Sequence, residues 1–154
     1  MLLAQMLLVV PISRFSLFTS QPHETGEWGP AAKKHPDQKY VILLVDDDAD
    51  CREMLADLLS GEGYIVVSAE NGREALDYLS GSTPALIILD LMMPVMSGWE
   101  FRARQKSDPK LESLPVVVTS ASGLVHGIDA DAIVSKPIDF GLLMSVVKQN
   151  CPSP

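Results

Sequence analysis

The chain has few cysteines and few basic residues. Its 154 residues include only Cys51 and Cys151, too few for a disulfide framework and not in a spacing that would bind zinc. Twelve Lys and Arg stand against twenty Asp and Glu, which gives a net charge of −8. Such a surface repels phosphate backbones and anionic lipids, so no direct nucleic-acid or membrane binding is expected. Cysteine usage favours a reducing, cytoplasmic location.

A long apolar run is also missing. The run over residues 1–12 is too short to span a bilayer, and no basic residue precedes it as a secretory signal requires. Residues 21–38 contain three prolines and two glycines without periodicity, which is typical of a linker. We therefore expect a poorly ordered N-terminal extension over residues 1–38, one folded domain over 39–150 and a tail over 151–154. A weak membrane or partner-docking role for residues 1–12 is the less favoured alternative.

From residue 39 onward, short apolar runs alternate with segments of helical periodicity. Strands are expected at 40–45, 64–67, 85–89, 116–118 and 132–135, and helices near 51–61, 72–80, 99–106 and 139–149. The apolar stripes consist of Cys51, Met54, Leu55, Leu58 and Leu59 in the first helix and of Leu142, Leu143, Val146 and Val147 in the last. Strands that are hydrophobic along their length predict an α/β fold, a doubly wound parallel sheet with helices on both faces.

Polar side chains stand at the carboxyl ends of the predicted strands. They are Asp46, Asp47 and Asp48 after the first strand, Asp90 after the third, Thr119 after the fourth and Lys136 after the fifth. The carboxyl ends of parallel strands line one crevice, so these groups are expected to meet. Carboxylates a few ångströms apart repel by roughly 4 kcal/mol per pair at an effective dielectric of 20. The cluster therefore calls for a cation, and hard oxygen ligands suit Mg²⁺.

Four segments, in this order, are similar to the receiver domain of two-component response regulators. They are LLVDDD at 43–48, LIILDLMMPVMSGWEF at 86–101, VVVTSAS at 116–122 and SKP at 135–137. Each segment alone is weak, but four in order at predicted strand ends are specific. The resemblance covers about residues 39–150. It implies a flavodoxin-like sheet of five strands and a protein that catalyses only its own phosphorylation and dephosphorylation, and is not otherwise an enzyme.

The resemblance also implies a role for each acidic residue. Asp90 would be the phosphoacceptor. Asp46 and Asp47 would form the acidic pair that holds Mg²⁺, together with Asp90 and the backbone carbonyl of Met92. Asp48 would instead begin the following helix, where a carboxylate lies at a favourable end of the helix dipole.

Two further residues would complete the site by the same resemblance. Thr119 would hydrogen-bond the phosphoryl group on activation, and Lys136 would pair with it, with Pro137 in a cis peptide. Chemically, the metal and Lys136 neutralise charge while an aspartyl nucleophile attacks, and the added charge of about −2 then draws in the Thr119 hydroxyl.

Three departures from the family pattern alter these expectations. The segment between Thr119 and Lys136 is short, so the fourth helix should be short or missing. Ile133 stands three residues before the lysine, where the family often has Tyr or Phe, which puts output through the usual face in doubt. Met92 and Ala121 occupy the two positions that tune hydrolysis of the aspartyl phosphate. Neither can orient a water molecule, so slow autodephosphorylation is expected.

The sequence thus predicts a stand-alone, phosphorylation-dependent switch whose phosphodonor is a histidine kinase or phosphotransfer protein. No output domain follows Asn150, so a downstream protein target or a change in self-association, such as homodimerisation, is expected to carry the signal. The alternative is a degenerate receiver that docks proteins without phosphorylation.

Three other classes fit the residues less well. A haloacid-dehalogenase-like phosphatase needs a second acid two residues after its nucleophile, where Met92 stands. A flavin mononucleotide site needs hydroxyls or glycines after the first strand, and three aspartates would repel its phosphate. An EF-hand loop beginning at Asp46 would have Cys51 at its glycine position and Asp57 in place of its closing glutamate.

Overall fold

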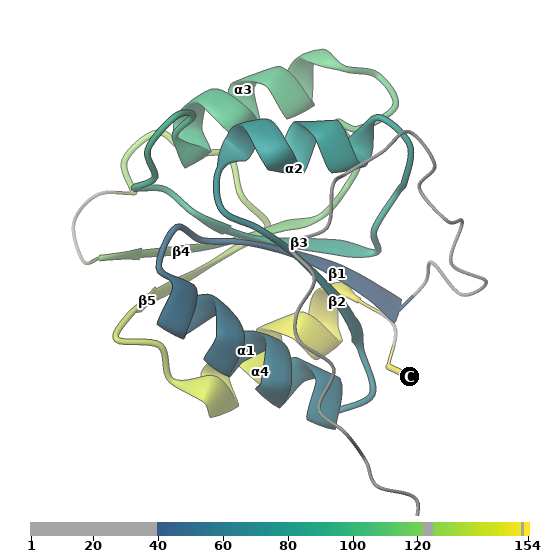
Figure 1. The fold of residues 1–154 in the computed structure, drawn as a ribbon, viewed down its shortest axis with the longest axis vertical. Coiled ribbons are helices and arrows are strands. Elements are labelled where there is room, and N and C mark those ends of the chain that lie inside the picture. Colours follow the sequence, from purple (N-terminus) through teal and green to yellow (C-terminus); the bar gives the residue numbers. More distant parts are fainter. Residues whose placement is uncertain (1–39, 122–124, 152) are drawn as a thin grey trace, which may run out of the picture.

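The computed structural model describes residues 40–121, 125–151 and 153–154. The expected N-terminal extension therefore lies outside the described residues. The elements are β1 (Val41–Val45), α1 (Ala49–Gly61), β2 (Ile65–Ala69), α2 (Gly72–Leu79), β3 (Leu86–Asp90), α3 (Gly98–Ser107), β4 (Val116–Ala121), β5 (Ala132–Lys136) and α4 (Phe140–Asn150). The strands form one parallel sheet in the order β2-β1-β3-β4-β5, which confirms the predicted fold class (Figure 1).

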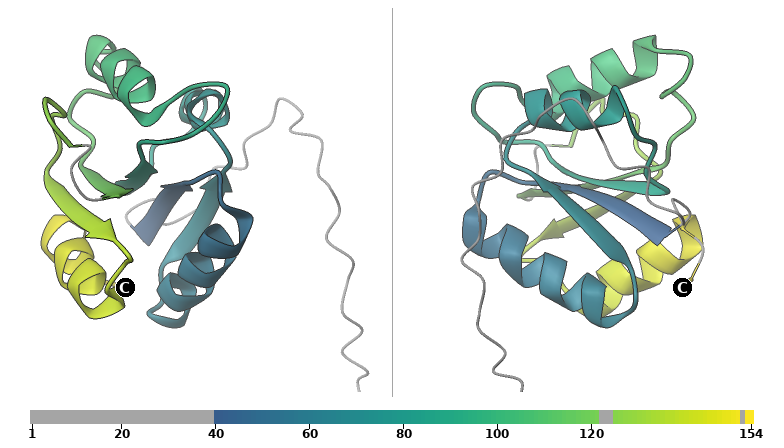
Figure 2. Two further views of the ribbon diagram at one scale, coloured as in Figure 1. Left: turned by 90° about the vertical axis from the view of Figure 1, so that its left-hand side faces the viewer. Right: turned by 45° about the vertical axis from the view of Figure 1, so that its right-hand side comes forward.

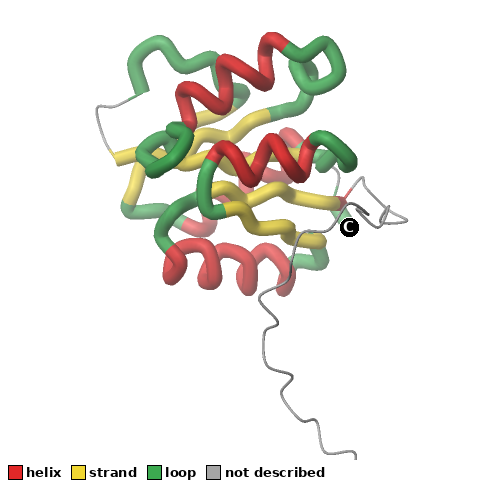
Figure 3. The backbone as a smooth tube through the Cα atoms, turned by 45° about the horizontal axis from the view of Figure 1, so that its top comes forward, coloured by secondary structure: helices red, strands yellow, loops and turns green. Residues whose placement is uncertain are grey.

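Helices cover both faces of this sheet. α1 and α4 lie on one face, and α2 and α3 lie on the other (Figures 2 and 3). The side chains of β1 alternate between the two layers: Leu43 and Val45 join the core under α2 and α3, and Ile42 and Leu44 join the core over α1 and α4. Because both faces of β1 are buried, its sequence is a continuous apolar run. Burial of each of these side chains contributes roughly 1.5–3 kcal/mol to the stability of the fold.

The two edge strands are less buried than expected. β1 and β3 are buried at every position, whereas β2 and β5 each have one buried residue and are otherwise partly or fully exposed. Ile65 in β2 is 36% exposed and Ile133 in β5 is 44% exposed. The edge strands are thus partly open to solvent although their sequences are largely apolar, because each edge strand has a sheet neighbour on one side only.

Strand boundaries also shift from the sequence prediction. β4 does not end at Thr119 but continues through Ala121, because β5 continues to pair with it as far as the register Ala121 to Lys136. Asp90 and Lys136 are the last residues of their strands. The side chain of Thr119 therefore extends from the strand itself, next to Asp90 in the β3–β4 register.

The helix stripes are narrower than predicted. Met54 and Leu58 of α1 are 49% and 38% exposed, and Leu142 of α4 is 52% exposed. Met144, which the predicted stripe omits, is buried instead. A helix on a sheet buries only the residues that point at the strands, and flanking positions of the stripe stay at its rim. Among the described residues, no helix is both long and apolar enough to cross a bilayer.

The connection from β4 to β5 contains no helix over its described residues 125–131, as the short spacing predicts. Instead, side chains from α3 hold it. Arg102 donates through Nε to the carbonyl oxygen of Asp129 at 2.5 Å and through Nη1 to Gln105, and Lys106 pairs with Asp129 at 2.7 Å. The residues that pack from this connection on the α2–α3 core are Val125, Ile128 and Ala130. Residues 125–131, which we call the β4–β5 strap, thus form an irregular segment in place of a helix.

Candidate functional site

Three carboxylates converge at the carboxyl edge of the sheet. Asp46 follows β1, Asp90 ends β3, and one oxygen atom from each of Asp46, Asp47 and Asp90 lies within 4.8 Å of the others. The Nζ atom of Lys136 is 2.9 Å from Oδ2 of Asp46 and 3.5 Å from Oδ1 of Asp90. The fold therefore brings together four of the residues singled out from the sequence, from three different strand ends.

Burial separates these carboxylates into two kinds. Asp46 and Asp90 are 1% and 4% exposed, whereas Asp47 is exposed. Burial raises the pKa of the Asp90 carboxyl group, and the charge of Asp46 raises it further. The pKa of Asp90 is lowered by the charge of Lys136 and by hydrogen bonds from the backbone amides of Leu91 and Met92. These contributions are smaller, so the pKa stays above its ordinary value. Asp90 is thus a carboxylate that water solvates poorly, beside the one ammonium group among the described residues of this cluster.

Lys136 is held as a cation. Burial alone would lower the pKa of its ammonium group, but the hydrogen bond and charge of Asp46, together with the charge of Asp90, outweigh burial and raise it. Cys51, on the first turn of α1, also faces Asp46. Burial, followed by the charge of Asp46, raises the pKa of the Cys51 thiol to about 11, so this thiol stays protonated at neutral pH.

The loop after β3 is tightly built. The backbone amide of Leu91 donates to Oδ1 of Asp90 at 2.9 Å, and the amide of Gly98 donates to the carbonyl oxygen of Leu91 at 3.0 Å. Ser97 caps α3 by accepting from the amide of Glu100. The side chain of Met92 is 58% exposed beside this turn. These contacts fix the direction in which the Asp90 carboxylate points.

The remaining predicted residues lie on the neighbouring strands. Thr119 is 1% exposed in β4, and Ala121 faces outward at the end of β4, opposite Lys136 in the register. Lys136 is followed by a cis peptide bond to Pro137, as the resemblance implies. Asp48 accepts from the amides of Asp50 and Cys51 and so caps α1, in agreement with its expected role at the helix start.

A family model for the response regulator receiver domain matches residues 42–148. The chain belongs to this family. The matched segment begins in β1 and ends in α4, so it includes all of the site residues described above.

Two curated proteins illustrate the relationship. The chain is 38% identical over 114 residues to response regulator Rre1 of Synechocystis, with 70% of this chain and 49% of that protein aligned. It is 37% identical over 116 residues to an uncharacterised 14.6 kDa protein of Leptolyngbya boryana, with 71% of this chain and 88% of that protein aligned. The receiver thus spans about half the length of Rre1 and most of the length of the second relative.

Solved structures show the same fold. The response regulator TrrA of Thermotoga maritima, in complex with Mg²⁺ and BeF, is 34% identical with a TM-score of 0.65, and the match covers 71% of this chain and 96% of that one. The chemotaxis protein CheY4 of Vibrio cholerae is 27% identical with a TM-score of 0.66, and the match covers 71% and 97% of the two chains. The chain is therefore a receiver domain of the kind found in two-component response regulators, and it has the CheY-like fold.

The donor set of the receiver suits a divalent cation. Three carboxylates offer hard oxygen ligands within 4.8 Å of one another, and the exposed Asp47 leaves one side open to solvent. Mg²⁺ commonly binds through one or two carboxylates and retains several waters, which such a half-open cluster permits. The residues present therefore fit the cation that the sequence predicts.

Sequence reasoning missed two residues that shape this site, Arg52 and Gly98. Arg52 donates to the carbonyl oxygen of Asp46 at 2.7 Å, and its position six residues later, in the first turn of α1, is the one signal that could have indicated it. A Cβ atom at Gly98 would clash with the backbone around Asp90. From the sequence alone, Gly98 is no more than a turn residue after Asp90.

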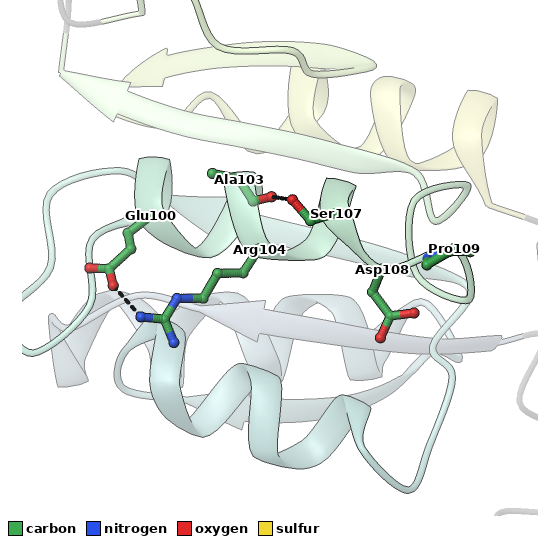
Figure 4. A pocket seen from close by; sticks show the side chains of 6 residues that line it. All are labelled: Glu100, Ala103, Arg104, Ser107, Asp108 and Pro109. Atoms are coloured by element: carbon green, nitrogen blue, oxygen red, sulfur yellow. Dashed lines mark hydrogen bonds and ion pairs between the residues drawn. The ribbon is translucent and has the colours of Figure 1, made fainter.

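A shallow cavity of about 500 Å³ lies on the outer side of α3, apart from the acidic cluster. Its lining consists of Glu100, Ala103, Arg104, Ser107, Asp108 and Pro109. Figure 4 shows the ion pair of Glu100 with Arg104 across it, at 2.6 Å. Its lining includes none of the residues predicted for the site, so it takes no part in the chemistry considered next.

Proposed function

We propose that this receiver accepts a phosphoryl group on Asp90 from a histidine kinase or a phosphotransfer protein and acts as a phosphorylation-dependent switch. The observation that carries the proposal is the position of Asp90, which is buried at the end of β3 and lies beside two further carboxylates and Lys136. A poorly solvated carboxylate that is held beside a cation is suited to act as a nucleophile.

In the proposed reaction, a carboxylate oxygen of Asp90 attacks the phosphorus atom of a phosphohistidine. The new oxygen–phosphorus bond forms as the phosphorus–nitrogen bond breaks, and the bonding electron pair leaves with the imidazole. Lys136, whose Nζ is already 3.5 Å from Oδ1 of Asp90, donates to a phosphoryl oxygen and stabilises the charge that develops there.

Asp46, Asp47 and Asp90 would hold Mg²⁺, with the backbone carbonyl of Met92 as a further ligand. Bound Mg²⁺ would neutralise charge on the phosphoryl oxygens during transfer. The contribution of the protein is to hold the carboxylates together before the phosphodonor arrives.

The switch follows from the position of Thr119. Thr119 is buried in β4 and is the Cα partner of Asp90 in the register with β3, so it lies on the strand next to the new phosphoryl group. The added charge of about −2 attracts the Thr119 hydroxyl as a donor, which pulls on β4 and its neighbour β5. A downstream protein or a change in self-association then reads the altered surface of the receiver, which we take to extend over residues 39–150.

One observation supports a second candidate, a receiver that docks proteins without being phosphorylated. The described part of the β4–β5 connection lacks a helix, and Ile133 on β5 is 44% exposed at the position where the family often has an aromatic residue. If the output face no longer responds to Asp90, binding alone is left as a function.

Incubation with acetyl phosphate and Mg²⁺, followed by intact mass spectrometry, tests the proposal. Wild type should gain the mass of one phosphoryl group, and Asp90→Asn should gain none. Asp57→Asn is a matched control, because Asp57 is an exposed aspartate of α1, and it should gain the same mass as wild type. No mass gain in wild type would overturn the phosphoacceptor proposal and leave the docking module.

A further inference from the structure

Arg52 connects two loops at the edge of the acidic cluster. It extends from the first turn of α1, and its side chain is only 13% exposed. Its Nη1 atom donates to the backbone carbonyl oxygen of Asp46 at 2.7 Å, and its Nη2 atom donates to Oε1 of Glu70, just after β2, at 3.3 Å. The guanidinium group is planar and rigid. Because it donates to two partners at once, it is well suited to hold the backbone carbonyl group of Asp46 in place.

Asp46 is held at three separate atoms. Its Oδ1 accepts from the amide of Asp48 at 2.9 Å, its Oδ2 accepts from Lys136 at 2.9 Å, and its backbone oxygen accepts from Arg52. The backbone oxygen belongs to the peptide group that joins Asp46 to Asp47. Holding this peptide plane restricts the directions in which the side chain of Asp47 can leave the backbone, although Asp47 itself is exposed.

We infer that Arg52 is a positioning residue that orients Asp47 for binding of a divalent cation. The inference rests on the proposed function, in which Asp47 is a ligand. Arg52 never needs to touch the cation. It acts through the peptide group between the two acidic residues, and Glu70 holds the far side of the guanidinium and offsets its charge.

Two physical effects of Arg52 have opposite signs, which makes the inference testable. As a positive charge near the cluster, Arg52 repels a cation, so its removal would strengthen binding if Coulomb forces alone mattered. As a positioning residue, Arg52 preorganises a ligand, so its removal weakens binding. Loss of groups that orient metal ligands commonly weakens metal affinity by about 10-fold to 100-fold.

The experiment measures Mg²⁺ affinity by isothermal titration calorimetry for wild type and three variants. Arg52→Met should bind Mg²⁺ about 10-fold more weakly, in the range expected for loss of an orienting group. Arg52→Lys keeps the charge but loses the two-pronged contact, and it should also bind more weakly. Lys148→Met is the matched control, because it removes one positive charge from an exposed ion pair with Glu62, and it should bind as wild type does.

Phosphorylation by acetyl phosphate gives a second measurement. In Arg52→Met, the Mg²⁺ concentration at half-maximal rate should rise, whereas the rate at saturating Mg²⁺ should return to near that of wild type. A merely structural role would lower the rate at every Mg²⁺ concentration. Thermal unfolding without Mg²⁺ shows whether each variant is folded. If Arg52→Met does not fold, Arg52→Lys takes its place in both measurements.

Equal or tighter Mg²⁺ binding by both Arg52→Met and Arg52→Lys would overturn the inference while leaving the proposed function intact. A wild-type protein that neither binds Mg²⁺ nor becomes phosphorylated would instead overturn the proposed function, and the positioning role with it.

Discussion

A Cβ atom added to Gly98 would overlap the backbone carbonyl oxygen of Asp90 and lie 2.8 Å from the Cα atom of Leu91. Gly98 is the first residue of α3, and Asp90 is the last residue of β3. The start of the helix therefore packs directly against the backbone that carries the proposed phosphoacceptor. Only a residue without a side chain permits this approach.

Gly98→Ala should destabilise the fold and disturb the site. Overpacking of this kind costs about 1–3 kcal/mol, which urea unfolding would measure as a lower midpoint. Gly61→Ala is the control, because a Cβ atom there would meet nothing within 4 Å. It ends α1, so alanine should leave the stability unchanged or raise it by up to about 1 kcal/mol. Equal stability of both variants would contradict the packing explanation.

Millimolar Mg²⁺ should raise the melting temperature of wild type, because a cation that binds only the folded protein stabilises it. The gain is about 2.7 kcal/mol when Mg²⁺ is at 100 times its dissociation constant. The double variant Asp46→Asn/Asp47→Asn should show no such rise, since its two best ligands are neutral amides. Differential scanning calorimetry with and without Mg²⁺ makes the comparison, and an equal rise in both proteins would exclude this site.

The aspartyl phosphate should be long-lived in wild type and shorter-lived in Met92→Asn and Ala121→Glu. Met92 and Ala121 are both exposed near the site, and each substitution supplies a polar group that can orient a water molecule for hydrolysis. The measurement is the loss of bound phosphoryl group after the phosphodonor is removed. A longer lifetime in either variant would refute the prediction.

Arg102→Ala should be far more damaging than Arg104→Ala, although both residues lie on α3. Arg102 is 4% exposed, and its loss leaves Gln105 and the carbonyl oxygen of Asp129 without their donor, at a cost of about 3 kcal/mol. Arg104 forms an exposed ion pair with Glu100, which contributes about 0.3–0.5 kcal/mol. Urea unfolding of the two variants checks the difference, and similar midpoints would show that the β4–β5 strap does not depend on Arg102.

The sequence alone predicts the parallel α/β fold and the strand-end acidic residues correctly, because both depend on local patterns. β1 reads as a buried strand since both of its faces are covered. The Asp48 and Asp139 caps are also predictable, because each carboxylate accepts from amides two or three residues later in its own helix.

What the sequence does not predict depends on contacts between distant segments. The extension of β4 to Ala121 requires pairing with β5, and the exposure of Leu142 depends on how α4 lies on the sheet. The position of Arg52 six residues after Asp46 is a weak signal, because a lysine or arginine at the start of a helix is ordinarily a solvated residue. Its role is visible only once Glu70 and the Asp46 carbonyl are placed beside it.

Asp46 and Lys136 touch at 2.9 Å although 90 positions separate them along the chain. During synthesis on the ribosome, Asp46 emerges long before Lys136, and the sheet cannot add β5 until that last strand has left the exit tunnel. A growing polypeptide therefore presents its aspartates without their ammonium partner. The cluster gains its ammonium group only when β5 pairs with β4, so the carboxylates repel one another unrelieved until the last strand is in place.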